Sequence, residues 1–248
     1  WSGTSDGLNI YDYRADSVIQ VRNNTPGYHL DYNDITYLSP GKNPQITWVG
    51  TYGQGIRYYD WQKKRFIPLR LPVTRGVESP LFVMSLLEDD NNRLWIGTRH
   101  NGLYKFDLQT RKLEYFRVPE MGVFIRTIFQ DSFRRIWIGS SNGCYLYNET
   151  TNKLELVKYP ADLLNNSIGS ITEDNQGKIW IGTESNVIHF SVRSFSLNQT
   201  FAYQSVQYGV SSNKLNCPSV NTIFADKDNN VWIGTAWGGM NMLRGIPA

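Results

Sequence analysis

Residues 93–116 read RLWIGTRHNGLYKFDLQTRKLEYF, and the pattern of this segment recurs along the whole chain. Short apolar runs alternate with turn residues in it, which predicts antiparallel strands at 93–97, 102–107 and 112–116. Its core is the tetrapeptide WIGT, and equivalent tetrapeptides begin at Trp1, Trp48, Trp95, Trp137, Trp180 and Trp232, at intervals of 47, 47, 42, 43 and 52 residues. A period in the forties with strand-like content is typical of a β-propeller, in which each repeat forms one four-stranded blade.

A further strand precedes each tryptophan-bearing strand, and in the best-preserved unit it spans 83–88. We expect a single all-β propeller domain, or a portion of one, with six units at about 1–21, 35–69, 81–116, 123–157, 168–200 and 219–248. The first unit lacks its innermost strand and the last lacks its outermost strand, so the pattern predicts 22 strands. Because a propeller closes its ring to protect its sheet edges, we expect this chain to be part of a larger ring.

The repeated tryptophans are expected to lie between consecutive blades. Burying such a ring stabilises a fold by about 3–5 kcal/mol. The glycine two residues later lets a neighbouring backbone approach closely. We therefore assign a structural role in the blade core to Trp48, Trp95, Trp137, Trp180 and Trp232.

Composition excludes several classes of function. The net charge of the 248-residue chain is +3, and its 25 Lys and Arg are scattered among 22 Asp and Glu, so no nucleic acid partner is expected. Cys144 and Cys217 match no metal-ligand spacing, and we expect neither a metal nor a cofactor. No run approaches 18 consecutive apolar residues, so no membrane span is expected within the chain.

Two local motifs are better explained by the repeat than by chemistry. Ser5 and Ser141 lie in G-x-S-x-G matches, but both matches fall on a hairpin turn between strands, whereas a hydrolase nucleophile needs a strand followed by a helix. The run from Asp226 to Asn230 resembles the start of a calcium loop but lacks the glycine and glutamate that such a loop requires. We expect no catalytic residue in either segment.

We name the four strands of a blade a to d, from the centre outward. The topology then places the b–c turns and the d–a connections on one face, and binding groups concentrate on such loops. The candidate ligand-binding residues on this face are Tyr52, Gln54, Arg99, His100, Asn142, Glu184 and Trp237. Tyr52 and Trp237 are large aromatic residues where most equivalents are small or polar, so we expect them to stack on a flat ligand face. The alternative is that they cover the ring or contact another domain.

The unit at 88–116, with its ED, RLWIGT, NGLY, FD and KLEYF elements, closely resembles the two-component regulator propeller repeat. That repeat occurs in the extracytoplasmic sensor region of hybrid two-component systems. The resemblance implies two consecutive propellers in the periplasm, followed by an immunoglobulin-like module, a membrane helix, a histidine kinase and a response regulator. It also implies a homodimer that senses oligosaccharides and switches on glycan-utilisation genes. No ligand residue is carried over from the family.

Two rival functions remain open at this stage. The first is a propeller lyase, in which His100 with Glu184 or Arg99 would act as base and electrophile, although no acid and base pair stands out. The second is a pure interaction scaffold of the WD-repeat type, although the dipeptides of that family are absent. The leading interpretation is a non-enzymatic sensor propeller of a receptor kinase.

Overall fold

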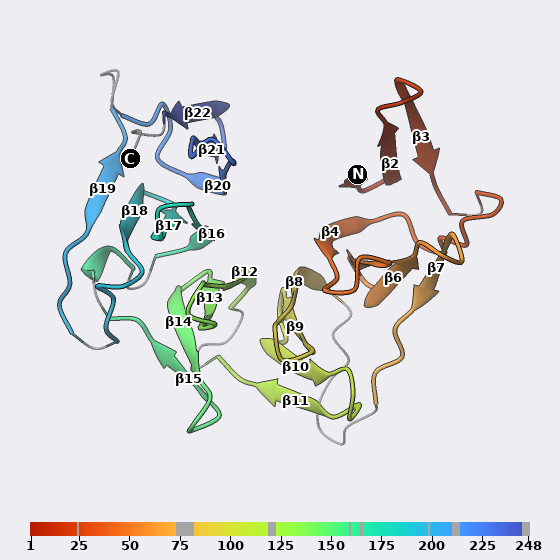
Figure 1. The fold of residues 1–248 in the computed structure, drawn as a ribbon, viewed down its shortest axis with the longest axis horizontal. Helices are drawn as coiled ribbons and strands as arrows, with labels where there is room; N and C mark the ends of the chain where they lie inside the picture. Colours follow the sequence, from red (N-terminus) through yellow and green to blue (C-terminus); the bar gives the residue numbers. More distant parts are fainter. Residues whose placement is uncertain are drawn as a thin grey trace. The chain divides into compact units, whose positions relative to one another are not determined.

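The fold was analysed in a computed structural model, which describes residues 1–23, 25–72, 82–118, 123–158, 160–163, 166–197, 199–209 and 214–244. Its regular structure in these ranges consists of 22 strands, as predicted, and one short 3-10 helix, η1 (Ala161–Leu163). The chain divides into two compact units, residues 1–125 and 126–248, which we describe separately (Figure 1). Every sheet is antiparallel and follows chain order, so the predicted all-β propeller fold is confirmed.

The first unit contains three sheets, each a meander of consecutive strands. The first sheet holds β1 (Ser2–Thr4), β2 (Gly7–Asp12) and β3 (Ser17–Val21). The second holds β4 (Ile35–Pro40), β5 (Ile46–Thr51), β6 (Ile56–Asp60) and β7 (Arg65–Pro68). The third holds β8 (Val83–Glu88), β9 (Arg93–Thr98), β10 (Leu103–Asp107) and β11 (Leu113–Phe116). The first sheet thus lacks strand a, as the repeat pattern predicted.

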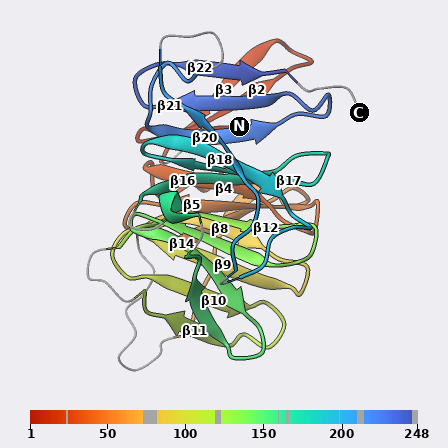
Figure 2. The ribbon, with the colours of Figure 1, turned by 90° about the vertical axis from the view of Figure 1, so that its left-hand side faces the viewer.

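The second unit also contains three sheets, and the boundary between the units falls at the start of β12. Its first sheet holds β12 (Ile125–Gln130), β13 (Ile136–Ser140), β14 (Gly143–Asn148) and β15 (Lys153–Leu156). The next holds β16 (Ile168–Glu173), β17 (Lys178–Thr183), β18 (Asn186–Ser191) and β19 (Gln204–Gln207). The last holds β20 (Val220–Ala225), β21 (Val231–Thr235) and β22 (Met240–Leu243), which Figure 2 shows side by side.

One predicted boundary is wrong. The fifth unit was expected to end near 200, but its outer strand β19 lies at Gln204–Gln207, in the segment between the predicted fifth and sixth units. The reason is an aromatic cluster: Phe195 and Phe201 pack against Phe190, with ring centroids 5.7 and 4.7 Å from it. Burying these rings holds the segment after β18 as a loop, and the strand pairing resumes only beyond it.

The glycines of the first five tetrapeptides each face the next sheet. A Cβ atom there would lie 2.5–2.7 Å from a methyl carbon of an Ile or Val at the start of the next inner strand. The pairs are Gly3 with Ile35, Gly50 with Val83, Gly97 with Ile125, Gly139 with Ile168, and Gly182 with Val220. The close neighbour is therefore mainly a β-branched side chain and not the backbone that the sequence predicted. The glycine makes room for this side chain between the sheets.

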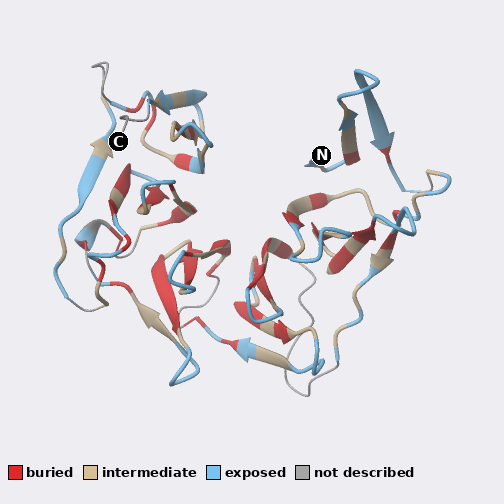
Figure 3. Cartoon of the chain, viewed as in Figure 1, coloured by how far each residue is buried: buried red, intermediate tan, exposed pale blue. Residues whose placement is uncertain are grey.

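The terminal sheets are buried on one face only. In the last sheet Val220, Ile223 and Ile233 are buried, whereas Phe224 on the other face is 62% exposed. In the first sheet Tyr11 is 55% exposed. Figure 3 shows the exposed colour over much of β3 and β22, while the inner strands of the interior sheets, such as β9, β13 and β17, are largely buried. The opposite face of each terminal sheet thus presents apolar side chains to solvent.

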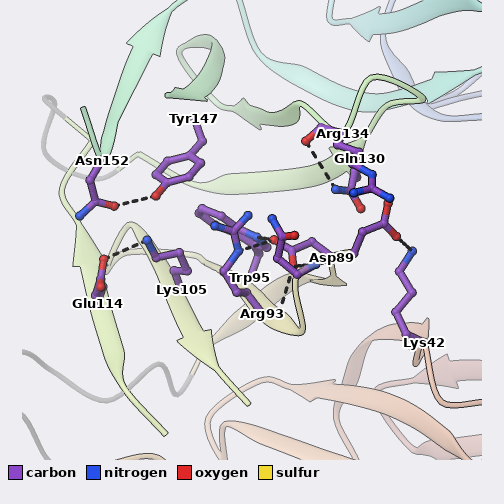
Figure 4. Close-up of polar contacts among 12 residues, drawn as sticks. Lys42, Asp89, Arg93, Trp95, Lys105, Glu114, Gln130, Arg134, Tyr147 and Asn152 are labelled. Atoms are coloured by element: carbon purple, nitrogen blue, oxygen red, sulfur yellow. Dashed lines mark hydrogen bonds and ion pairs between the residues drawn. The ribbon is translucent and has the colours of Figure 1, made fainter. Parts of the chain in front are cut away.

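A buried carboxylate anchors most of the repeated tryptophans. Asp89 follows β8, and its Oδ2 accepts hydrogen bonds from Trp95 Nε1 at 2.7 Å and Arg93 Nε at 2.7 Å (Figure 4). Its Oδ1 accepts the backbone N–H groups of Asn91 and Arg93. The same aspartate-to-indole bond recurs from Trp137 to Asp131, Trp180 to Asp174 and Trp232 to Asp226, at 2.8, 2.8 and 2.9 Å. A turn residue therefore satisfies the polar atom of a buried ring.

The second sheet departs from this rule. Position 42, six residues before Trp48, is a lysine, and the Trp48 indole donates instead to Glu88 Oε2 of the next sheet at 2.7 Å. Trp48, Trp95, Trp137 and Trp180 are buried, and Trp232 in the last sheet is partly exposed.

Candidate functional site

The b–c turns are built by the threonine or serine that ends each tetrapeptide. Thr98 Oγ1 donates to Gly102 O at 2.8 Å and accepts the N–H of Asn101 at 3.0 Å, which fixes the three turn residues between them. Equivalent side-chain bonds are made by Thr4, Thr51, Ser140, Thr183 and Thr235. This residue was given no role from the sequence, although its recurrence at one position was a usable signal.

The b–c turns and the d–a connections do share one end of the sheets. Tyr52 N–H donates to Asp34 O, Arg99 N–H to Phe82 O, and Ala236 N–H to Ser219 O, at 3.0, 3.0 and 2.9 Å. Each bond joins the residue after β5, β9 or β21 to the segment that leads into an inner strand. Side chains of the two loop types therefore lie side by side, as the topology predicted.

In the first unit the structure brings two predicted residues into contact. Arg99 Nη1 donates to Tyr52 Oη at 2.7 Å, and its guanidinium carbon lies 5.4 Å from the Tyr52 ring centroid. Phe82 packs edge-on against Tyr52 at 4.9 Å, and the Phe124 ring centroid lies 5.3 Å from the same guanidinium carbon. We call Tyr52, Phe82, Arg99 and Phe124 the Arg99 cluster. It combines aromatic surface with a planar cation.

Gln54 lies beside a second arginine on the same turn. Its backbone oxygen accepts a hydrogen bond from Arg57 Nη1. Arg57 also forms a two-point ion pair with Asp31, with Nε–Oδ1 at 2.5 Å and Nη2–Oδ2 at 2.7 Å. The Arg57 hydrogen bond, opposed by partial burial, holds the pKa of the Asp31 carboxyl below its ordinary value. The pair ties the segment before β4 to β6.

This ion pair predicts a pH dependence of stability. Because the folded state lowers the pKa of Asp31, the stabilisation is fully present above the unfolded pKa of about 3.9 and is lost as pH falls through the folded value. Chemical unfolding midpoints of wild type and Asp31→Asn should therefore differ at pH 7 and converge below about pH 3. In an Arg57→Gln background, adding Asp31→Asn should change the unfolding midpoint at pH 7 by less than it does in the wild-type background. If the difference in midpoint between wild type and Asp31→Asn stays constant down to about pH 2.5, the Asp31–Arg57 pair is not the source of the pH dependence.

The other candidates are spread over both units. His100 is exposed and lies edge-on to Phe124, with ring centroids 5.4 Å apart. Asn142 N–H donates to Ser140 Oγ at 3.1 Å. In the second unit Glu184 Oε1 lies 3.9 Å from Arg126 Nη1, and in the last sheet Trp237 is 91% exposed. Of the seven, Tyr52 and Arg99 are joined by a side-chain hydrogen bond.

Two hollows lie at the opposite end of the sheets, where strand c meets the c–d turn of the following sheet. One, of about 380 Å³, is lined by Trp48, Tyr58 and Asp60 of the second sheet and by Leu108 and Arg111 of the third. The other, of about 360 Å³, lies at the equivalent place in the second unit and is lined by Tyr147, Asn148 and Phe195 among others. None of the seven candidates lines either hollow, and neither hollow was foreseen from the sequence.

Within the described residues, no group of three or more His, Cys, Asp and Glu side chains is arranged to hold a metal ion. The run from Asp226 to Asn230 is a tight turn, in which Asp226 Oδ1 accepts the backbone N–H groups of Asp228 and Asn230. The same part of the chain contains no helix with the length and hydropathy of a membrane span.

The comparisons with known proteins agree with the repeat pattern. The family model for the two-component regulator propeller matches residues 78–100, 162–185 and 214–237. A histidine kinase of Formosa agariphila is 28% identical over 208 residues, which is 78% of this chain and 15% of the relative. The crystal structure of the extracellular domain of a putative hybrid two component system from B. thetaiotaomicron is 28% identical, with a TM-score of 0.81.

That alignment covers 97% of this chain and 31% of the solved domain, so the chain spans under a third of the length of the histidine kinase and of this solved domain. Streptogramin B lyase is also similar, at 13% identity and a TM-score of 0.66, and this likeness shows the fold alone. Three segments of this chain therefore match the two-component regulator propeller family, and the chain is similar to the extracellular domain of a hybrid two-component system.

Proposed function

We propose that this chain is the ligand-sensing propeller of a membrane receptor histidine kinase, facing the periplasm, and that its b–c face binds oligosaccharides. The observation that carries the proposal is the likeness to the extracellular domain from B. thetaiotaomicron, at 28% identity over 97% of this chain. The kinase relative supports the same class of parent protein. In this proposal the chain itself is not an enzyme.

The chemistry of the Arg99 cluster supports a sugar ligand. Sugar rings present flat apolar faces bordered by hydroxyl groups, and aromatic side chains stack on such faces while polar groups orient the hydroxyls. Tyr52 supplies a ring and a hydroxyl, and Gln54 and His100 are exposed beside it. Signalling would follow if the ligand favoured one arrangement of a receptor dimer by a few kcal/mol, which would then regulate genes for glycan use.

A thermal-shift screen with neutral and acidic oligosaccharides tests the proposal. A ligand present at 100 times its Kd and bound only to the folded state stabilises it by about 2.7 kcal/mol, so its melting temperature should rise. We expect Tyr52→Ala to abolish the shift and Trp237→Ala to weaken it, each compared with its own ligand-free protein. Because Trp237 is 91% exposed, its removal should leave the ligand-free melting temperature unchanged. If no glycan of any class raises the melting temperature, the oligosaccharide proposal is refuted.

A further inference from the structure

Arg99 differs from the other partly buried arginines in what balances its charge. Arg57 pairs with Asp31, Arg93 with Asp89, and in the second unit Arg135 pairs with Asp131, at N–O distances of 2.5–2.7 Å. Arg126, also partly buried, lies farther from its carboxylate, with Nη1 3.9 Å from Glu184 Oε1. Among the residues that the structure describes, Arg99 has no carboxylate partner. Its one hydrogen-bond acceptor there is the neutral hydroxyl of Tyr52.

The guanidinium of Arg99 is also incompletely hydrogen-bonded. Its Nε atom is buried and has no hydrogen-bond partner in the described part of the chain. A charged group removed from water is stable only when it is paired and its donors are satisfied. Arg99 is thus a partly buried cation with an unsatisfied donor at the b–c end of the third sheet, and no carboxylate among the described residues balances it.

The two aromatic rings fix how Arg99 could meet a ligand. The guanidinium carbon lies 5.4 Å from the Tyr52 ring centroid and 5.3 Å from that of Phe124, and Tyr52 Oη holds Nη1. Because Nε is buried, the N–H groups that remain for an oxyanion are those of the two Nη atoms, and a guanidinium held in this way loses little freedom when they bond it. Neighbouring His100 is exposed and is a further donor within the same turn.

We infer that Arg99 binds an acidic group on the ligand, the carboxylate of a uronic acid or a sulfate ester on a sugar. The inference rests on the proposed function and narrows its ligand to anionic oligosaccharides. The oxyanion provides the counter-ion that Arg99 lacks among the described residues, and the stacked sugar ring lies against Tyr52. Neutral sugars leave the cation unbalanced and bind more weakly.

Isothermal titration with three probes tests this inference: a galacturonic acid tetrasaccharide, a sulfated chondroitin tetrasaccharide and neutral maltotetraose. We expect an acidic probe to bind, with affinity that falls at least about tenfold in Arg99→Gln and falls less in Arg99→Lys. Arg111→Gln is the matched control, because it removes the same charge at the opposite end of the same sheet. Raised salt should weaken the acidic probes only.

The outcomes separate the inference from the proposed function. Binding of only the uronate or only the sulfated probe assigns the acidic group. Binding of maltotetraose with the same affinity in wild type and Arg99→Gln would overturn the inference and leave oligosaccharide sensing intact. Absence of binding by all three probes would overturn both.

Stability of the ligand-free protein gives a second readout. Because Arg99 has no counter-ion in the described structure, Arg99→Gln should leave the melting temperature within about 2 °C of wild type or raise it. Arg57→Gln, which breaks an ion pair, should lower it. If Arg99→Gln lowers the melting temperature as much as Arg57→Gln does, the role of Arg99 is to stabilise the fold, and the inference fails.

Discussion

Replacement of Asp131 by alanine is expected to reduce the free energy of unfolding by about 3–5 kcal/mol, the usual cost of removing one partner of a buried ion pair. The Asp131 side chain is 0% exposed. It accepts hydrogen bonds from Trp137 Nε1 at 2.8 Å and Arg135 Nε at 2.6 Å, and from the backbone N–H groups of Phe133 and Arg135. Its loss would leave an indole N–H and a guanidinium without their acceptor inside the sheet packing.

Urea unfolding of wild type, Asp131→Ala and Asp131→Asn measures this effect. Asparagine keeps one carbonyl oxygen for the turn N–H groups and loses the charge that faces Arg135. Asp131→Asn should therefore lower the free energy of unfolding by less than Asp131→Ala does. The double variant Asp131→Ala with Arg135→Met should recover part of the loss, because it removes the unpaired cation as well. A loss below about 1 kcal/mol in Asp131→Ala would show that the buried carboxylate is not an anchor of the blade.

Alanine at Gly182 is expected to cost about 1–3 kcal/mol through overpacking between two sheets. Its Cβ would lie 2.5 Å from Val220 Cγ1 and 3.0 Å from Val220 Cβ, atoms of the next inner strand. Val220 is buried and cannot withdraw without disturbing β20. The sheets that pack on this contact would have to separate by some tenths of an ångström.

Gly234 is the matched control, because it occupies the same position in the last sheet. A Cβ there meets only Thr222 Cγ2 at 2.7 Å, on an exposed side chain, and the next atom is 3.9 Å away. Gly234→Ala should therefore cost less than about 1 kcal/mol. Thermal unfolding of the two variants in parallel gives the comparison, and equal losses would show that sheet contact is not the cause.

Much of the fold follows from local sequence. Alternation and turn residues within each unit placed 22 strands correctly in number, because strand pairing between neighbours depends on residues only a few positions apart. The Asp89-to-Trp95 bond could also have been found, since an aspartate precedes Trp95, Trp137, Trp180 and Trp232 by six residues each time. The fifth outer strand was misplaced because the packing of Phe195 and Phe201 is a tertiary effect.

The sequence by itself therefore determined the blades, their order, the loops at each end and the buried tryptophan of each four-stranded blade, because all of these depend on a period and on turn chemistry. Only the tertiary structure decided which side chains of neighbouring sheets come into contact. Trp48 uses Glu88 of the next sheet, and Arg99 meets Tyr52 from a turn 47 residues away. Such contacts depend on the register between sheets, which the tetrapeptide glycines and their β-branched neighbours set in space, and no local pattern records it.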